Sequence, residues 1–203
     1  MKRPPVKVML PILLAMLAAI LLVATGHIAP PPPSNGSPLK IIIYTDFQCG
    51  ACEKLHSEVE PKLRELYVDT GKAQIEMRLL GAMDSDSMRG AQAALCAGDQ
   101  GKLLEYMDAL FDAYAEDEDA AVFSVEALIS LAAELGLDDG AFATCLNSEA
   151  KRAEVEENMD TAQTDDVSKL PAFLVGNFTI EGRWPLDTYI QTIETVLATQ
   201  PPQ

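Results

Sequence analysis

Polar and apolar residues divide this chain into an apolar start, a proline-rich stretch and a long region with the periodicity of strands and helices. An uncharged run at 8–24 follows three basic residues, and four consecutive prolines stand at 30–33. A basic start, an apolar run and a proline-rich polar exit are typical of an export segment. We therefore predict that residues 1–26 are a signal peptide or an N-terminal membrane anchor and that residues 27–38 are a stiff linker.

The length of the apolar run bears on whether this segment is cut. Its 17 residues exceed the apolar part of a usual signal peptide and approach the roughly 20 that span a bilayer. We therefore favour a membrane-anchoring helix, with a cleaved signal and a secreted or periplasmic product as the alternative. Either alternative leaves the rest of the chain extracytoplasmic.

A strand, a helix and a second strand are predicted after the linker. Residues 40–45 form a β-branched run suited to a strand buried on both faces. From about 49 to 68, apolar residues recur at spacings of three and four, as in an amphipathic helix, and Pro61 should kink that helix. Residues 73–80 alternate polar and apolar side chains, which predicts a strand parallel to the first. The result is a βαβ unit.

Helical periodicity dominates the next part of the chain, and the predicted subdomain occupies about 84–164. The helices expected there are 88–97, 102–115, 124–135, 139–146 and 149–163. Ser124 supplies a hydroxyl cap at the start of one helix, and Gly136 closes the same helix.

Two short strands and a helix are predicted to complete the chain. Residues 170–182 read as a strand, a Gly-Asn turn and an antiparallel strand, and 185–197 as an amphipathic helix with Pro185 in its first turn. The order βαβ, helical block, ββα predicts an α/β thioredoxin fold with an inserted all-helical subdomain. We assign this fold to residues 39–200.

The charge of the chain excludes one class of partner. The formal net charge is −16 and the isoelectric point is about 4.4, so most of the surface would repel a phosphate backbone. We expect no nucleic-acid partner. The acidic run at 116–119 lacks the spacing of a calcium loop and is predicted to be a solvated loop.

Candidate chemistry is concentrated in Cys49 and Cys52, which stand three positions apart directly after the first strand. If Cys49 opens the helix, its sulfur lies among the unpaired N–H groups of the first turn, where the helix dipole favours an anion. Gly50 and Ala51 add no bulk around that sulfur. The pattern predicts a reversible disulfide, with Cys49 as the exposed attacking thiolate and Cys52 as the buried resolving thiol.

Geometry limits where Cys49 can lie. Cβ atoms three residues apart within a helix are about 5 to 6 Å apart, slightly beyond disulfide reach, so Cys49 should occupy the looser end of the helix.

Other interpretations of the pair are weaker. A zinc site needs four ligands, but the chain has one such couple, with His27 in the linker and His56 on the same helix. An inert structural disulfide across so small a loop would remove little entropy from the unfolded chain. His56 could tune the pair, although we favour a partly buried histidine with satisfied hydrogen bonds.

The run at 43–77, with D-F-x-C-x-x-C after its first strand, resembles the opening of the DsbA-like thiol-disulfide oxidoreductases, particularly their exported bacterial branch. Segments 93–97, 142–146 and 170–175 fall where that branch has its helical insertion and its cis-proline strand. The resemblance covers roughly 39–198. The chain differs in having Gly50-Ala51 between the cysteines in place of Pro-His.

The resemblance implies roles for Leu170 and Pro171. It implies that Pro171 is cis and faces the active-site sulfurs, whereas a trans proline opening a strand is the plain alternative. The backbone of Leu170, where the family more often has Thr or Val, would then pair with an extended substrate.

The resemblance also implies a second, structural disulfide between Cys96 and Cys145, with two buried free thiols as the alternative. An exported chain can keep such a pair oxidised.

The function implied is that of an extracytoplasmic thiol-disulfide oxidoreductase that donates its Cys49–Cys52 disulfide to folding secreted proteins with cysteines. A membrane quinone-linked partner of the DsbB or vitamin K epoxide reductase type would reoxidise it. No cofactor and no metal are expected. An extracytoplasmic reductase or isomerase, and a redox-inactive peptide-binding chaperone, remain as alternatives.

Overall fold

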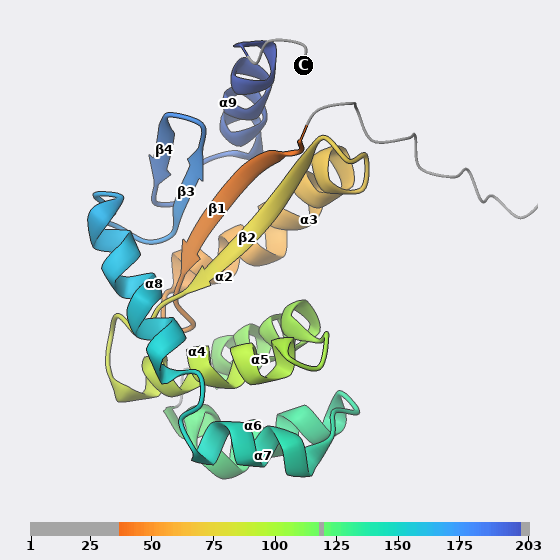
Figure 1. Ribbon diagram of the computed structural model, residues 1–203, viewed down its shortest axis with the longest axis vertical. Coiled ribbons are helices and arrows are strands. Elements are labelled where there is room, and N and C mark those ends of the chain that lie inside the picture. The colour runs from red at the N-terminus through yellow and green to blue at the C-terminus, as the bar shows by residue number, and fades with distance from the viewer. Residues whose placement is uncertain (1–36, 118–119, 200–203) are drawn as a thin grey trace, which may run out of the picture. The chain divides into compact units, whose positions relative to one another are not determined.

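A four-stranded mixed sheet organises the part of the chain that the computed structural model describes, residues 37–117 and 120–199 (Figure 1). The strand order is β2-β1-β3-β4. The strands are β1 (Leu39–Thr45), β2 (Ala73–Leu79), β3 (Ala172–Val175) and β4 (Phe178–Glu181). The predicted thioredoxin fold with an inserted helical subdomain is confirmed.

Strand directions follow from the connections. β1 pairs in parallel with β2, from which it is separated by a helical crossover, and Ile41 lies opposite Ile75. β3 runs antiparallel to both β1 and β4. The predicted Gly-Asn turn joins β3 to β4, and Gly176 has a φ of 57°, a conformation that a side chain would disfavour.

Alternation along β1 sends its side chains into two different cores. Ile41 and Ile43 face a cluster that includes Leu63 from the first helical stretch and Tyr189 from α9 (Leu186–Thr199). On the opposite face, Tyr44 joins a cluster completed by α8 (Arg152–Thr164). Figure 1 shows α8 in front of the sheet and α2 and α3 behind it, so helices cover both faces.

The helix predicted over 49–68 is present but changes type along its length. Its parts are α2 (Gly50–Lys54), the π-helical η1 (Leu55–Val59), α3 (Glu60–Leu63) and the π-helical η2 (Arg64–Val68). The Glu60 N–H bonds to the Leu55 C=O, one residue before Pro61, which has no N–H to donate. The predicted distortion at Pro61 is therefore a widened turn.

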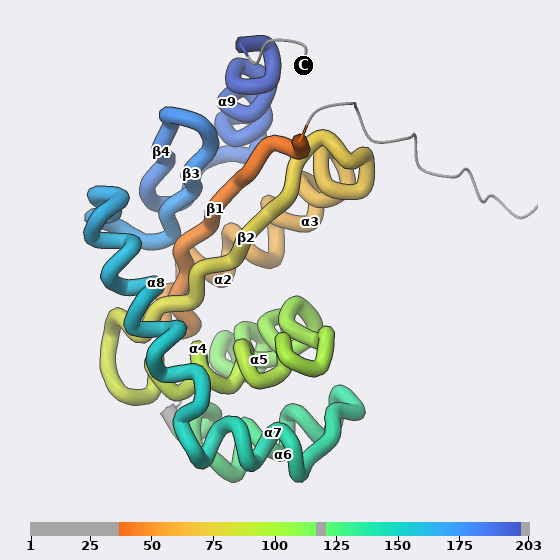
Figure 2. Tube along the Cα trace, in the orientation of Figure 1, coloured from red at the N-terminus to blue at the C-terminus, as the bar shows by residue number. Residues whose placement is uncertain are grey.

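The chain leaves the sheet after β2, passes through the insertion and returns along α8 to β3 (Figure 2). The inserted elements are α4 (Ser85–Gly98), α5 (Leu103–Asp117), the 3-10 helix η3 (Ala120–Phe123), α6 (Val125–Glu134), α7 (Asp139–Asn147) and α8. The predicted cap is confirmed, because the Ser124 hydroxyl accepts the Ala127 N–H at 3.3 Å. The acidic run begins inside α5 and not in a loop.

α8 begins at Arg152, three residues later than the periodicity predicted. Glu149 adopts a φ of 52°, in the left-handed region. Its N–H bonds to the Leu146 C=O, and the Ala150 N–H bonds to the Cys145 C=O. This is the Schellman arrangement that ends a helix, and here it ends α7 without a glycine.

The insertion has its own core and its own crosslink. Tyr106, Phe123 and Phe142 are fully buried in a cluster that also contains Cys49 and Cys52. Cys96 of α4 and Cys145 of α7 form a disulfide whose Cα atoms are 6.0 Å apart.

The proposed export segment, 1–26, lies outside the described residues, as does all of the linker before residue 37. Within 37–117 and 120–199, none of the helices has the length and apolar character needed to cross a membrane.

Removing the crosslink of the insertion should lower stability. The Cys96→Ala/Cys145→Ala variant loses a bridge between residues 49 positions apart. The chain-entropy argument gives a loss of up to about 4 kcal/mol in the free energy of unfolding. Urea unfolding under oxidising conditions measures this loss, and an unchanged free energy of unfolding would contradict the prediction.

Candidate active site

Cys49 lies between the end of β1 and the start of the first helix. It is the N-cap of α2, with an extended backbone (φ −99°, ψ 101°), and Gly50 is the first helical residue. Its own N–H bonds to the Asp46 C=O at 3.2 Å. The predicted position at the loose end of the helix is confirmed.

The short loop before Cys49 is held by the buried carboxylate of Asp46. One of its oxygens accepts the Gln48 N–H at 2.9 Å, and the other accepts the Ala82 N–H at 2.8 Å. The second oxygen also accepts a short hydrogen bond from the Ser87 hydroxyl of α4. Asp46 therefore ties the loop before Cys49 to the start of the insertion.

The two sulfurs differ in environment. Cys49 and Cys52 form a disulfide with Cα atoms 5.2 Å apart, and Cys49 is 9% exposed whereas Cys52 is fully buried. The Cys52 N–H donates to the Cys49 sulfur at 3.3 Å. After reduction, the same N–H and the positive end of the helix would stabilise a thiolate at Cys49.

The Gly50 side of this turn is open, whereas Cys49, predicted to be exposed, is largely buried. Gly50 is exposed, and a side-chain carbon added there would meet no atom within 4 Å. Another protein can therefore approach along this side.

Cys49 opens into a cavity of about 470 Å³ that it shares with Leu170. Leu80, Met83, Ala162 and Val167 supply the apolar part of its lining. Leu170 precedes the buried Pro171, and the peptide bond between them is cis. The structure thus brings together Cys49 and Leu170, which are 121 positions apart in the sequence.

His56 is a buried histidine with both ring nitrogens occupied. Nδ1 lies 2.8 Å from a Glu60 carboxylate oxygen, and Nε2 lies 2.7 Å from an Asp108 oxygen. Arg64 bonds to the other oxygen of Glu60. The favoured interpretation of His56 as a satisfied histidine is confirmed, and its contacts lead to α5 of the insertion.

This network shifts the pKa values of His56 and Glu60. Burial opposes a charge on the imidazole, but the hydrogen bond and charge of Glu60, together with Asp108, raise the pKa of His56 above its ordinary value of 6.5. Burial alone would raise the pKa of Glu60, because it disfavours the charged carboxylate. The hydrogen bonds and positive charges of His56 and Arg64 outweigh burial and hold the pKa of Glu60 below its usual range.

Sequence reasoning missed Asp46, Ser87 and Asp108. Asp46 carried a signal, because an acidic residue directly after a buried strand needs hydrogen-bond donors. Ser87 and Asp108 carried none, since their partners are 41 and 52 positions away.

The Asp46 carboxylate should be essential to stability. In Asp46→Ala, two backbone N–H groups and a hydroxyl lose a charged acceptor, so the free energy of unfolding should fall by about 3 kcal/mol. Urea unfolding measures it, with Asp69→Ala, an exposed residue, as the matched control. Equal effects of the two substitutions would refute this role.

Stability should depend on pH through His56. Because its pKa is raised in the folded state, its contribution is fully present below about pH 6.5 and is lost as the pH rises through the raised value. Urea unfolding from pH 6 to pH 9 should follow this trend, and His56→Gln should flatten it. A wild-type profile parallel to that of the variant would exclude this linkage.

Comparisons with known proteins identify the family of this chain. A sequence profile of the thioredoxin family matches residues 34–195. The probable disulfide bond formation protein D of Bacillus anthracis is 28% identical over 145 residues, which cover 70% of this chain and 66% of that protein. This chain therefore spans about two thirds of the length of that relative.

Two solved structures share the fold. Oxidised BdbD from Bacillus subtilis has a TM-score of 0.71 at 19% identity, covering 82% of this chain and 91% of that chain. DsbA from Chlamydia trachomatis has a TM-score of 0.68 at 23% identity, covering 86% of this chain and 94% of that chain. The chain therefore belongs to the thioredoxin family, and its C-x-x-C pair, Cys49 and Cys52, forms a disulfide at the start of the first helix.

Proposed function

We propose that this protein is an extracytoplasmic oxidase that donates the Cys49–Cys52 disulfide to folding secreted proteins with cysteines. The observation that carries the proposal is the Cys52 N–H directed at the Cys49 sulfur, at a helix start that opens into a cavity. Donors that stabilise the Cys49 thiolate favour the reduced form, and a stable reduced form makes its disulfide a strong oxidant.

The transfer proceeds in two exchanges. A client thiolate attacks the Cys49 sulfur and breaks the Cys49–Cys52 bond, which leaves a mixed disulfide and a Cys52 thiolate. A second client thiolate attacks the client's own sulfur and expels Cys49 as a thiolate. The client loses two electrons and gains a disulfide, and the protein gains two electrons and becomes a dithiol.

The cavity beside Cys49 suits an extended client. Its lining is mainly apolar and includes Leu170, which lies two residues before the start of β3. The Leu170 backbone would pair with a client segment, as in recognition by strand addition, and would hold a client cysteine over Cys49. Leu170 and Pro171 are therefore the proposed substrate-binding residues.

The export signature supports an extracytoplasmic site of action. Disulfides persist outside the cytoplasm, and this chain has two of them among its described residues. A membrane-anchored protein, or its secreted or periplasmic form after signal cleavage, would be reoxidised by a quinone-linked membrane partner of the DsbB or vitamin K epoxide reductase type.

Cys49→Ser should abolish exchange. Oxidation of a dithiol peptide and reduction of insulin, measured side by side, should both fall to background in this variant. The Cys96→Ala/Cys145→Ala variant is the matched control and should keep its peptide-oxidation rate. Activity that survives Cys49→Ser would refute the exchange mechanism.

The reduction potential, together with the rates from these two assays, gives the direction of electron transfer. A reduction potential well above about −270 mV, the value of thioredoxin, is expected for an oxidase. A potential near that of thioredoxin, with faster insulin reduction than peptide oxidation, would instead identify a reductase.

A further inference from the structure

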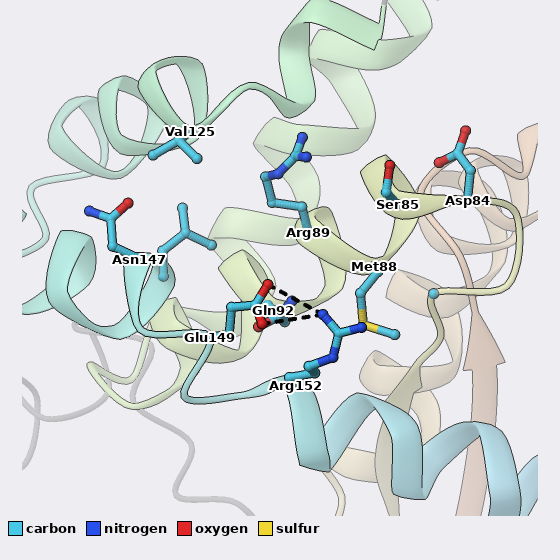
Figure 3. A pocket seen from close by; sticks show the side chains of 11 residues that line it. Asp84, Ser85, Met88, Arg89, Gln92, Val125, Asn147, Glu149 and Arg152 are labelled. Atoms are coloured by element: carbon cyan, nitrogen blue, oxygen red, sulfur yellow. Dashed lines mark hydrogen bonds and ion pairs between the residues drawn. The ribbon is translucent and has the colours of Figure 1, made fainter.

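The cavity of about 470 Å³ that contains Cys49 is lined on one side by residues 167–170, the segment before the cis-proline. Another cavity, of about 410 Å³, is lined mainly by residues of the helical insertion, and Figure 3 shows the Glu149–Arg152 ion pair at it. Its lining includes no cysteine and no residue of 167–170. The position of 167–170 therefore shapes the cavity at the exchanging sulfur and not the cavity of the insertion.

Backbone donors are few in the segment before β3. The Ser168 N–H donates to Glu181 Oε1 at 2.5 Å, and the Lys169 N–H donates to the same oxygen at 3.2 Å. Pro171 has no N–H. The N–H and the C=O of Leu170 have no hydrogen-bond partner among the described residues. The backbone of Leu170 is therefore available to another molecule.

Glu181 reaches this segment from the end of β4. Its backbone lies opposite Ala172 of β3, and its C=O accepts the indole N–H of Trp184 at 2.9 Å. Its second carboxylate oxygen accepts the Ser168 hydroxyl at 2.8 Å. A single carboxylate at the sheet edge thus accepts three hydrogen bonds from two consecutive residues of the segment.

These hydrogen bonds favour the charged form of the carboxyl group. The Ser168 N–H and hydroxyl, followed by the Lys169 N–H, hold the pKa of Glu181 below its usual range. A charged acceptor makes stronger hydrogen bonds than a neutral one. The segment is therefore held firmly at the two residues that precede Leu170.

We propose that Glu181 is a positioning residue for disulfide exchange with client chains. It fixes Ser168 and Lys169, so that the Leu170 backbone is held ready for an extended client beside Cys49. Strand addition needs backbone groups that are unpaired, and it is tighter where those groups are already ordered. The inference rests on the proposed function, because it assigns Glu181 to the binding of the client and not to the chemistry of the sulfurs.

Glu181→Met in the full-length protein tests the proposal, because it keeps the length of the side chain and removes both acceptor oxygens. The KM for oxidation of a dithiol peptide should rise about tenfold with little change in kcat, since the client must now order the segment. A tenfold rise corresponds roughly to fixing the backbone of one residue. An unchanged KM would overturn the positioning role.

Glu181→Gln separates hydrogen bonding from charge. Its amide oxygen can still accept both N–H groups, and its NH₂ group can donate to the Ser168 hydroxyl. The KM should therefore stay within about twofold of the wild-type value. A KM as high as that of Glu181→Met would contradict positioning by hydrogen bonds. Glu126→Met, an exposed residue of α6, is the matched control and should behave as the wild type does.

Dithiothreitol makes the test independent of general damage to the active site. This small dithiol cannot add as a strand, so it needs no ordered segment before Pro171. Its oxidation to the cyclic disulfide by the Cys49–Cys52 bond should have the same rate constant in the wild type and in Glu181→Met. A lower rate constant in the variant would overturn a role confined to client binding.

Amide hydrogen exchange of the wild-type protein tests the hydrogen bonds without any client. The N–H groups of Ser168 and Lys169 should exchange more slowly than that of Leu170, and equal protection of the three would contradict the proposal. A wild-type protein that oxidises dithiothreitol but no peptide would refute the proposed function. Peptide oxidation with an unchanged KM in Glu181→Met would refute the positioning role alone, so the two failures are distinguishable.

Discussion

The buried carboxylate of Asp46 is the constraint on which the arrangement of the active site depends. It stands at the end of β1 and accepts hydrogen bonds from the loop before Cys49, from the loop after β2 and from α4. These contacts hold the loop from which the first helix starts, with Cys49 as its N-cap. They also attach the insertion to the sheet next to the Cys49–Cys52 disulfide. The chemistry of the sulfur pair and the docking of the insertion thus share one anchor.

The inserted helices do more than cover the end of the sheet. Cys49 and Cys52 belong to the same apolar cluster as α4 to α7, and His56 reaches from the first helical stretch to Asp108 of α5. The insertion therefore provides part of the environment of both sulfurs. Its own disulfide ties α4 to α7 within this cluster.

Local patterns were enough to predict the fold, whereas the contacts that complete the site required the structure. Alternation in β1 and β2, the cap at Ser124 and the turn at Gly176 each depend on a few neighbouring residues, and each was predicted. The widened turn before α3 arises from a backbone conflict at Pro61 whose outcome depends on packing. Glu149 adopts a conformation usual for glycine, so α8 starts later than its periodicity indicated. The Asp46–Ser87 and His56–Asp108 contacts join distant segments, and no local pattern encodes them.

The edges of the sheet have a consequence for a protein whose proposed clients are unfolded chains. β4 has only four residues, and β2, on the other edge, alternates Gln74, Glu76 and Arg78 with its apolar residues. A short edge and a charged edge both discourage uncontrolled strand pairing. An extended client chain therefore finds no long, uncharged edge strand with which to pair. This limits co-aggregation of the client with the protein, even at high local concentrations of both molecules.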